Sequence, residues 1–166
     1  FGDNLQVMKN LLEMKKAGKL CNADGTPGVR LIYIDPPFAT KRDFGVNDNQ
    51  KAYQDKIAGA AFLEFLRKRL VVMRELLSED GTIYVHLDWR KGHYIKILLD
   101  EIFGEGNFQN EIIWQRLSAR SDSHTYNHIH DVIYFYGKTS RFKFNAQYSE
   151  YSQEYINKFY RYQDRW

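Results

Sequence analysis

Apolar side chains recur at helical spacing in four stretches of this 166-residue chain. The spacing predicts helices over Asn4–Lys16, Ala60–Leu77, Tyr94–Phe103 and, less regularly, Ser152–Tyr162. Gly81 and Gly104 follow the second and third helices, and glycine commonly ends a helix. The second helix has the clearest apolar face, so we expect it to supply core residues.

Short apolar runs between the helices predict strands. These strands are expected over Leu31–Ile34, Thr82–Leu87, Glu111–Leu117 and Val132–Tyr136. The first run is continuous, which is typical of a strand buried on both faces of a parallel sheet. The order of elements predicts an α/β fold whose sheet is mostly parallel, with an antiparallel pair at one edge. Ligands of such sheets bind beyond the carboxyl ends of the strands.

The tetrapeptide Asp35-Pro36-Pro37-Phe38 directly follows the first predicted strand. A residue before proline is driven into an extended conformation, and proline itself has a fixed φ and no N–H. The segment is therefore stiff, with a carboxylate and a carbonyl as acceptors and an aromatic ring beside them. Ala39–Lys56 continues as a polar, irregular stretch, long enough for a functional loop.

Two acceptors and a stacking face suit an amino group on an aromatic ring, such as N6 of adenine. Hydrogen bonds from both amino hydrogens would hold the nitrogen and free its lone pair to attack an electrophilic methyl group. A base within a duplex must first be flipped out, and an aromatic side chain can hold it. The alternative is that the tetrapeptide is only a rigid turn that closes a strand.

Composition narrows the class of protein only slightly. The aromatic share of 16% suits a surface that stacks on bases, and the net charge of +3 permits a nucleic-acid partner. Cys21 is the single cysteine, so a cytoplasmic location is expected. The sequence contains no apolar stretch long enough to span a membrane. Because it starts at Phe1 and stops within a polar, aromatic run, we expect it to be part of a longer protein.

Several segments together resemble a known family, the permuted (beta-class) DNA amino-methyltransferases, especially adenine-N6 modification subunits of type III restriction–modification systems. In the family's order, the segments are Gly2–Leu5, Leu31–Phe38, Asp80–Asp88, Asp100–Gly104, Asn110–Trp114 and His130–Tyr136. The resemblance runs from Phe1 to about Asn145 and is weaker beyond Tyr148.

This resemblance implies a Rossmann-like sheet, S-adenosylmethionine as methyl donor, and Asp35, Pro36, Pro37 and Phe38 as the catalytic loop. It also implies cofactor contacts from Asp3, Asn4 and Asp35. An ordinary helix cap explains Asp3 and Asn4 equally well. The family's glycine-rich cofactor loop does not occur in this sequence, so most of the cofactor site is expected outside it and the isolated chain is expected to be inactive.

Other polar residues have weaker functional interpretations. His86 and Asp88 share a strand face and are expected either at the rim of the pocket or in an ordinary hydrogen-bonded strand end. Arg116–Asn127 is expected to be a loop, either along DNA or simply in solvent. A metal site at the histidines 124, 128 and 130 is disfavoured because they lack partners at ligand spacing.

The sequence therefore predicts a site-specific DNA methyltransferase that modifies N6 of a flipped adenine. Cytosine-N4 methylation and a non-catalytic DNA-binding remnant are the alternatives. Residues 1–148 are expected to form the catalytic part, and residues 149–166 to begin a region that leads toward target recognition. Double-stranded DNA is the expected partner, with a restriction subunit or a second copy as further possible partners and no membrane involved.

Overall fold

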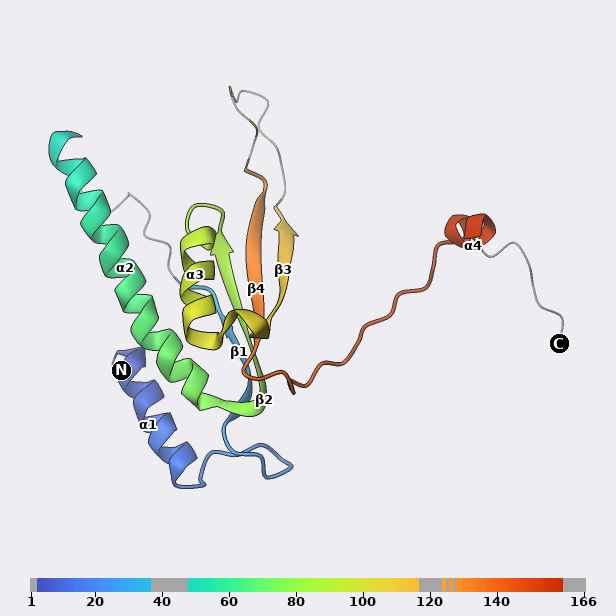
Figure 1. The fold of residues 1–166 in the computed structure, drawn as a ribbon, viewed down its shortest axis with the longest axis horizontal. Coiled ribbons are helices and arrows are strands. Elements are labelled where there is room, and N and C mark those ends of the chain that lie inside the picture. Colours follow the sequence, from blue (N-terminus) through green and yellow to red (C-terminus); the bar gives the residue numbers. More distant parts are fainter. Residues whose placement is uncertain (1–2, 37–47, 117–123, 125, 127, 160–166) are drawn as a thin grey trace.

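The described part of the protein forms a four-stranded sheet with three helices on one side and a tail that leads away to a short fourth helix (Figure 1). This computed structural model describes residues 3–36, 48–116, 124, 126 and 128–159, with the side chains of 48–58 excepted. Among the described residues, no helix combines the length and apolar character needed to cross a bilayer.

Helix α1 (Asn4–Lys16) has the predicted bounds. The Asp3 side chain caps it by accepting a hydrogen bond from the backbone N–H of Leu5 at 3.1 Å. Lys15 and Lys16 lie in its last turn, where cations interact favourably with the helix dipole. The expected helix cap is confirmed.

Helix α2 (Asp48–Leu76) begins before the predicted Ala60, so residues 48–56 are helical and the prediction of an irregular segment was wrong there. Strand β2 (Leu77–Asp88) follows without a loop. The prediction that Gly81 ends the helix was also wrong, because this glycine lies inside β2. Leu76 and Leu77 are both buried, so hydrophobicity alone does not reveal where the helix becomes a strand.

The remaining elements follow the predicted order. Helix α3 (Gly92–Phe103) ends at Gly104, whose φ of 89° and N–H donated to the carbonyl of Asp100 confirm its capping role. A short 3-10 turn, η2 (Glu105–Asn107), leads into the next strand. The other elements are β1 (Val29–Ile34), β3 (Phe108–Gln115), β4 (His130–Gly137) and α4 (Gln153–Phe159).

The strand order in the sheet is β1-β2-β4-β3. Strands β1 and β2 are parallel, with Tyr33 opposite Tyr84. Strand β4 is antiparallel to both β2 and β3. The α/β class and the antiparallel pair at one edge are thus confirmed, and among the strands that the structure describes only β1 and β2 pair in parallel.

The hydrophobic core lies between the helices and one face of the sheet. Its fully buried members include Leu70 of α2, Ile83 and Val85 of β2, and Leu99 of α3. Burying one such side chain contributes roughly 1.5–3 kcal/mol. Helices α2 and α3 contact each other as well as the sheet, so they form one continuous layer (Figure 1).

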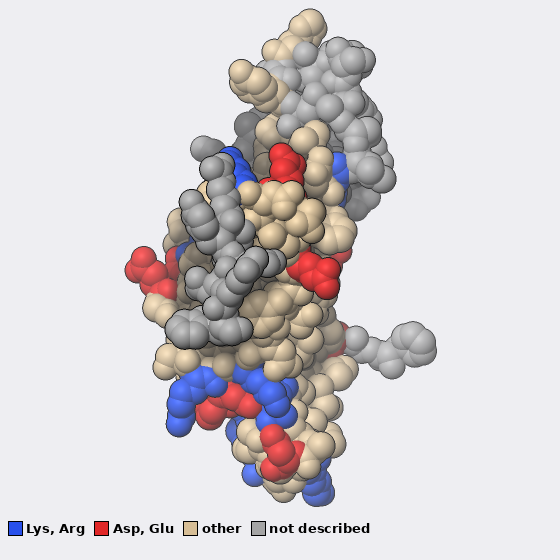
Figure 2. Space-filling view, turned by 90° about the vertical axis from the view of Figure 1, so that its right-hand side faces the viewer, with Lys and Arg blue, Asp and Glu red and all other residues tan. Residues whose placement is uncertain are grey.

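The opposite face of the sheet, here called the open face, is exposed at its two edge strands, whereas Asp88, Asp131 and Phe135 at its middle are buried. Leu31 and Tyr33 on β1 are 61% and 55% exposed, and Trp114 on β3 is 58% exposed. The prediction that β1 is buried on both faces was wrong for this reason, since no described helix covers this side. Figure 2 looks at the side that carries β3 and the tail, and much of its visible middle carries neither acidic nor basic residues.

Candidate active site

Asp35 lies immediately beyond the carboxyl end of β1 and is exposed, whereas Pro36 is buried. No described residue donates a hydrogen bond to the Asp35 carboxylate. The proline therefore anchors the segment while the carboxylate remains available to an external donor. Pro37 and Phe38, the other predicted members of this loop, lie outside the described residues.

A chain of polar side chains crosses three strands next to this loop. The Tyr33 hydroxyl lies 2.8 Å from Nδ1 of His86, and Nε2 of the same imidazole lies 3.2 Å from Oδ2 of Asp131. These side chains all belong to the open face, because their neighbours in sequence on β2 and β4 enter the core. These contacts link β1, β2 and β4. Tyr33, the member on β1, precedes Asp35 by two residues.

Asp131 is the most buried of these three side chains, with only 2% of its surface exposed. Its Oδ2 also accepts a hydrogen bond from Nε of Arg116 at 2.5 Å. Its Oδ1 has no partner among the described residues. A buried carboxylate needs charge compensation, and here Arg116 supplies it from beyond the end of β3.

Asp88 makes a second buried carboxylate at the same end of the sheet. It lies opposite Asp131 in the register of β2 and β4, and its Oδ2 is 2.8 Å from Nε of Arg90. Its Oδ1 accepts the backbone N–H of Arg90 at 3.0 Å. His86 and Asp88 thus share one strand face as predicted, and both are hydrogen-bonded at the strand end.

Trp89 follows Asp88 and is 41% exposed. Its indole stacks on His128, with ring centroids 3.5 Å apart and planes within 6°. The Arg90 guanidinium lies 5.8 Å from the centroid of the Trp89 ring. Within the described ranges, no group of three or more His, Cys, Asp or Glu residues is arranged to hold a metal ion.

Asp3 and Asn4 are held by Arg69, a buried residue of α2. Nη2 of Arg69 lies 2.6 Å from Oδ1 of Asp3, and its Nε donates to Oδ1 of Asn4 at 2.8 Å. The N–H of Leu5 and the nearby Arg69 cation lower the pKa of Asp3. The predicted cofactor residues Asp3 and Asn4 therefore have a structural partner, and none of their described contacts involves Asp35.

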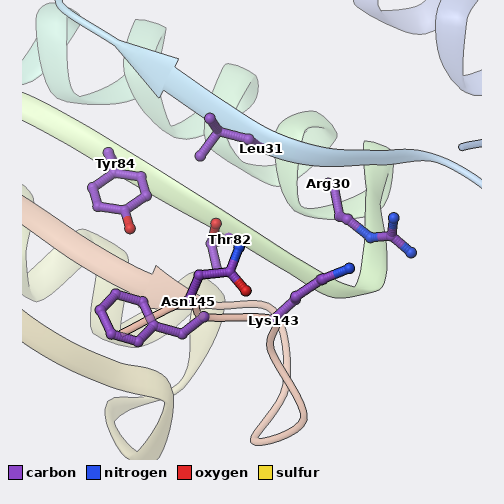
Figure 3. A pocket seen from close by; sticks show the side chains of 7 residues that line it. Arg30, Leu31, Thr82, Tyr84, Lys143 and Asn145 are labelled. Carbon is purple, nitrogen blue, oxygen red and sulfur yellow. The ribbon is translucent and has the colours of Figure 1, made fainter. Parts of the chain in front are cut away.

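A shallow pocket of about 380 Å³ lies on the open face, toward the amino-terminal end of β1 and away from Asp35 (Figure 3). Arg30, Leu31, Thr82 and Tyr84 form its floor and one side, and residues 143–145 of the tail lie over it. Burial raises the pKa of Tyr84. No sequence pattern predicted this pocket, because the tail segment reaches it only through the fold.

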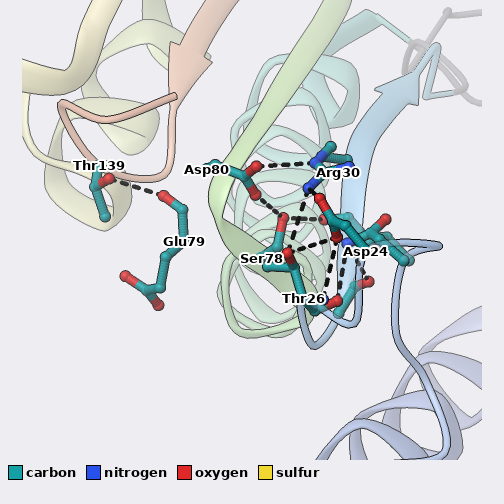
Figure 4. A network of polar contacts seen from close by, with 10 residues as sticks. Asp24, Thr26, Arg30, Ser78, Glu79, Asp80 and Thr139 are labelled. Carbon is teal, nitrogen blue, oxygen red and sulfur yellow. Dashed lines mark hydrogen bonds and ion pairs between the residues drawn. The ribbon is translucent and has the colours of Figure 1, made fainter. Parts of the chain in front are cut away.

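Arg30 also joins the loop before β1 to the start of β2 (Figure 4). Its guanidinium pairs with Asp24, and its Nε lies 2.8 Å from Oδ2 of Asp80. The Ser78 hydroxyl donates to the other oxygen of Asp80 at 2.7 Å. These donors lower the pKa of Asp80, and the Thr26 hydroxyl together with Arg30 lowers that of Asp24. This network is structural, and it lies at the end of the sheet away from Asp35.

The candidate site residues that sequence analysis missed are Tyr33 and Asp131. Tyr33 lies within a predicted strand, whereas Asp131 directly precedes the predicted strand Val132–Tyr136, which in the structure begins at His130. Their contacts with His86 depend on which strands are neighbours and in what register, which the alternation of side chains along a strand does not specify.

Comparison with known proteins identifies the family. The profile of a family described as DNA methylase matches residues 29–166. The chain belongs to this family. Within it, a type II methyltransferase, M.EcaI of Enterobacter cloacae, is 40% identical over 132 residues, which cover 79% of this chain. The StyLTI Mod subunit of a type III restriction-modification enzyme of Salmonella typhimurium is 32% identical over 183 aligned positions, covering 96% of this chain.

This chain spans only 29% and 26% of the lengths of these two relatives. Among solved structures, it is similar to the cytosine-N4-specific PvuII DNA methyltransferase, with a TM-score of 0.55 and 15% identity over 95% of this chain and 59% of that one. It is also similar to M1.HpyAVI, solved as a SAM complex, with a TM-score of 0.52 and 18% identity over 91% of this chain and 60% of that one. These similarities confirm the Rossmann-like methyltransferase fold.

Proposed function

We propose that this chain is the catalytic half of a site-specific DNA methyltransferase that acts on N6 of a flipped adenine. The observation that carries the proposal is the exposed Asp35 carboxylate, which follows a parallel strand and receives no hydrogen bond from a described residue. Membership of the DNA methylase family supports the proposal that the Asp35–Phe38 segment is the catalytic loop.

In this proposal, the Asp35 carboxylate and the Pro36 carbonyl each accept one hydrogen of the target amino group. The two hydrogen bonds orient the nitrogen lone pair toward the methyl donor and favour a tetrahedral nitrogen. Phe38 supplies the face on which the flipped base stacks. The chemistry that S-adenosylmethionine supplies when bound is an electrophilic methyl group on a sulfonium.

The described residues form only part of a site for that donor. Asp35 is available to contact the methyl donor. Asp3 and Asn4 are hydrogen-bonded to Arg69 and would contact the donor while keeping these hydrogen bonds. The sequence also lacks a glycine-rich cofactor loop. We therefore propose that residues outside this chain complete the cofactor site, and that residues 1–166 alone are inactive.

The proposed partner is double-stranded DNA, with a restriction subunit or a second copy of the protein as further proposed partners. Relatives named as Mod subunits of type III restriction-modification enzymes support this assignment. Residues 1–148 would form the catalytic part and residues 149–166 would begin the next region. The single cysteine, Cys21, is exposed and free, which suits the proposed cytoplasmic location.

Cytosine-N4 methylation is the second candidate because the same two acceptors would serve the amino group of cytosine. The similarity in fold to a protein named as cytosine-N4-specific supports this second candidate. The aspartate at position 35 favours adenine, since the N4 family usually has serine there. A non-catalytic remnant is supported by the missing glycine-rich loop alone.

The test is methyl transfer by the full-length protein that contains this chain. DNA methylated with a tritiated donor is digested to nucleosides, and mass spectrometry then distinguishes N6-methyladenine from N4-methylcytosine. Asp35→Ala should abolish transfer while leaving DNA affinity nearly unchanged, because phosphate contacts dominate affinity. Glu13→Gln, which alters an exposed carboxylate on α1, is the matched control and should be fully active. Near-normal turnover by Asp35→Ala would refute the role given to Asp35.

A further inference from the structure

Two arginines, Arg90 just after β2 and Arg116 just after β3, are held by carboxylates that lie opposite each other. Asp88 and Asp131 are register partners on β2 and β4, and each pairs with a different arginine. Nε of Arg90 lies 2.8 Å from Asp88, and Nε of Arg116 lies 2.5 Å from Asp131. Both ion pairs therefore belong to one end of the sheet, the end that also carries Asp35.

Burial within each pair is strongly asymmetric. Each aspartate side chain is only 3% exposed, whereas the Arg90 and Arg116 side chains are 52% and 55% exposed. The carboxylates are thus shielded from solvent and cannot lose their cations without a large desolvation penalty. The arginines are consequently fixed at Nε while the rest of each side chain reaches solvent.

The terminal nitrogens of these two guanidinium groups donate no hydrogen bond to a residue that the structure describes. These nitrogens carry donors in a planar arrangement that matches two oxygens of a phosphate. Because the buried carboxylates fix both arginines in advance, less side-chain entropy is lost when an anion binds.

An aromatic surface lies beside these cations. Trp89, which separates Asp88 from Arg90 in sequence, stacks on His128 and remains 41% exposed. A planar ring beside fixed guanidinium groups suits a polymer that carries both phosphates and stacked bases. An acidic protein surface would match the charge of this patch but not its aromatic part.

We propose that Arg90 and Arg116 form a phosphodiester-binding site that holds the DNA backbone next to the Asp35 loop. This inference rests on the proposed function, because it takes DNA as the substrate. Each arginine contacts one backbone phosphate, and the contacts are independent of base sequence. The pair therefore sets affinity and position, whereas the Asp35 loop performs the chemistry.

The test uses the full-length protein and paired substitutions that avoid a buried, unpaired charge. The variants Arg90→Gln with Asp88→Asn and Arg116→Gln with Asp131→Asn replace each ion pair by a neutral hydrogen-bonding pair. Thermal unfolding without DNA identifies variants that remain folded. Arg67→Gln with Glu101→Gln removes a similar pair from the helical side and serves as the control.

Fluorescence anisotropy with a labelled duplex gives the dissociation constant at several salt concentrations. Each of the two site variants should bind roughly three- to tenfold more weakly, equally for target and unrelated duplexes, and should reduce the salt slope by about 1. The control should match the wild type. Folded site variants that keep wild-type affinity and salt slope would overturn the inference. Wild-type protein that neither binds nor methylates DNA would instead overturn the proposed function.

Discussion

The hydroxyl of Tyr33 lies 2.8 Å from Nδ1 of His86, which fixes the carboxyl end of β1 to its neighbour β2. The imidazole continues this connection to the buried carboxylate of Asp131 on β4. Asp35 follows Tyr33 by two residues, so the proposed catalytic loop begins at a strand end that is held by side-chain contacts as well as by the backbone hydrogen bonds of the sheet.

Removing this hydroxyl should affect turnover more than stability. Tyr33→Phe loses one half-exposed hydrogen bond, which contributes about 0.5–1 kcal/mol to the free energy of unfolding. We expect a lower kcat with an unchanged KM for DNA, because the loop is less well positioned while DNA contacts remain. Urea unfolding and steady-state methylation of the full-length protein measure both quantities.

Tyr84→Phe is the matched control for this substitution. The Tyr84 ring stacks on Phe135 at 4.5 Å, and its hydroxyl has no hydrogen bond to a described residue. The control should retain wild-type kcat. Equal losses of kcat in both variants would contradict a positioning role for Tyr33.

Phe38 should tolerate other aromatic residues if it stacks on the flipped base. Phe38→Tyr and Phe38→Trp should retain methylation, whereas Phe38→Ala should lose about 1–3 kcal/mol of stacking. Fluorescence of 2-aminopurine at the target position reports base flipping. If Phe38 is a core residue instead, Phe38→Ala will lower the free energy of unfolding by roughly 3–5 kcal/mol while flipping stays normal.

Gly28 should be far less replaceable than Gly25, although both have positive φ angles, 98° and 82°. A Cβ at Gly28 would lie 2.4 Å from the carbonyl oxygen of Leu76, whereas one at Gly25 would meet nothing within 4 Å. Gly25→Ala should cost about 1–2 kcal/mol from backbone strain alone. Gly28→Ala should cost clearly more, and equal melting temperatures for the two variants would contradict the clash.

Acidification should destabilise the network around Arg30. The pKa values of Asp24 and Asp80 are lowered in the folded protein, so their contribution to stability is complete above the unfolded value near 4. That contribution is lost as the pH falls from about 4 through the lowered folded values. Urea midpoints measured between pH 7 and pH 2 should fall less steeply for Asp80→Asn than for the wild type. Parallel curves would contradict this assignment.

The sequence by itself determined the local elements that are governed by short-range chemistry. Asp3 before an apolar periodic run specified the start of α1, and Gly104 specified the end of α3, because capping depends on neighbouring residues. The stiffness of the Asp35–Phe38 segment likewise follows from its prolines. The boundary between α2 and β2 was mispredicted because Leu76 and Leu77 are apolar in either element.

Only the tertiary structure decided which strand ends face one another. Sequence alternation placed His86 and Asp88 on one face of β2, but it did not reveal that β4 would bring Asp131 opposite Asp88. Strand order also decided that β1 forms one edge of the described sheet with an exposed face, although its sequence is that of a buried strand. Register and neighbour choice depend on contacts between residues far apart in the chain, and no local pattern encodes them.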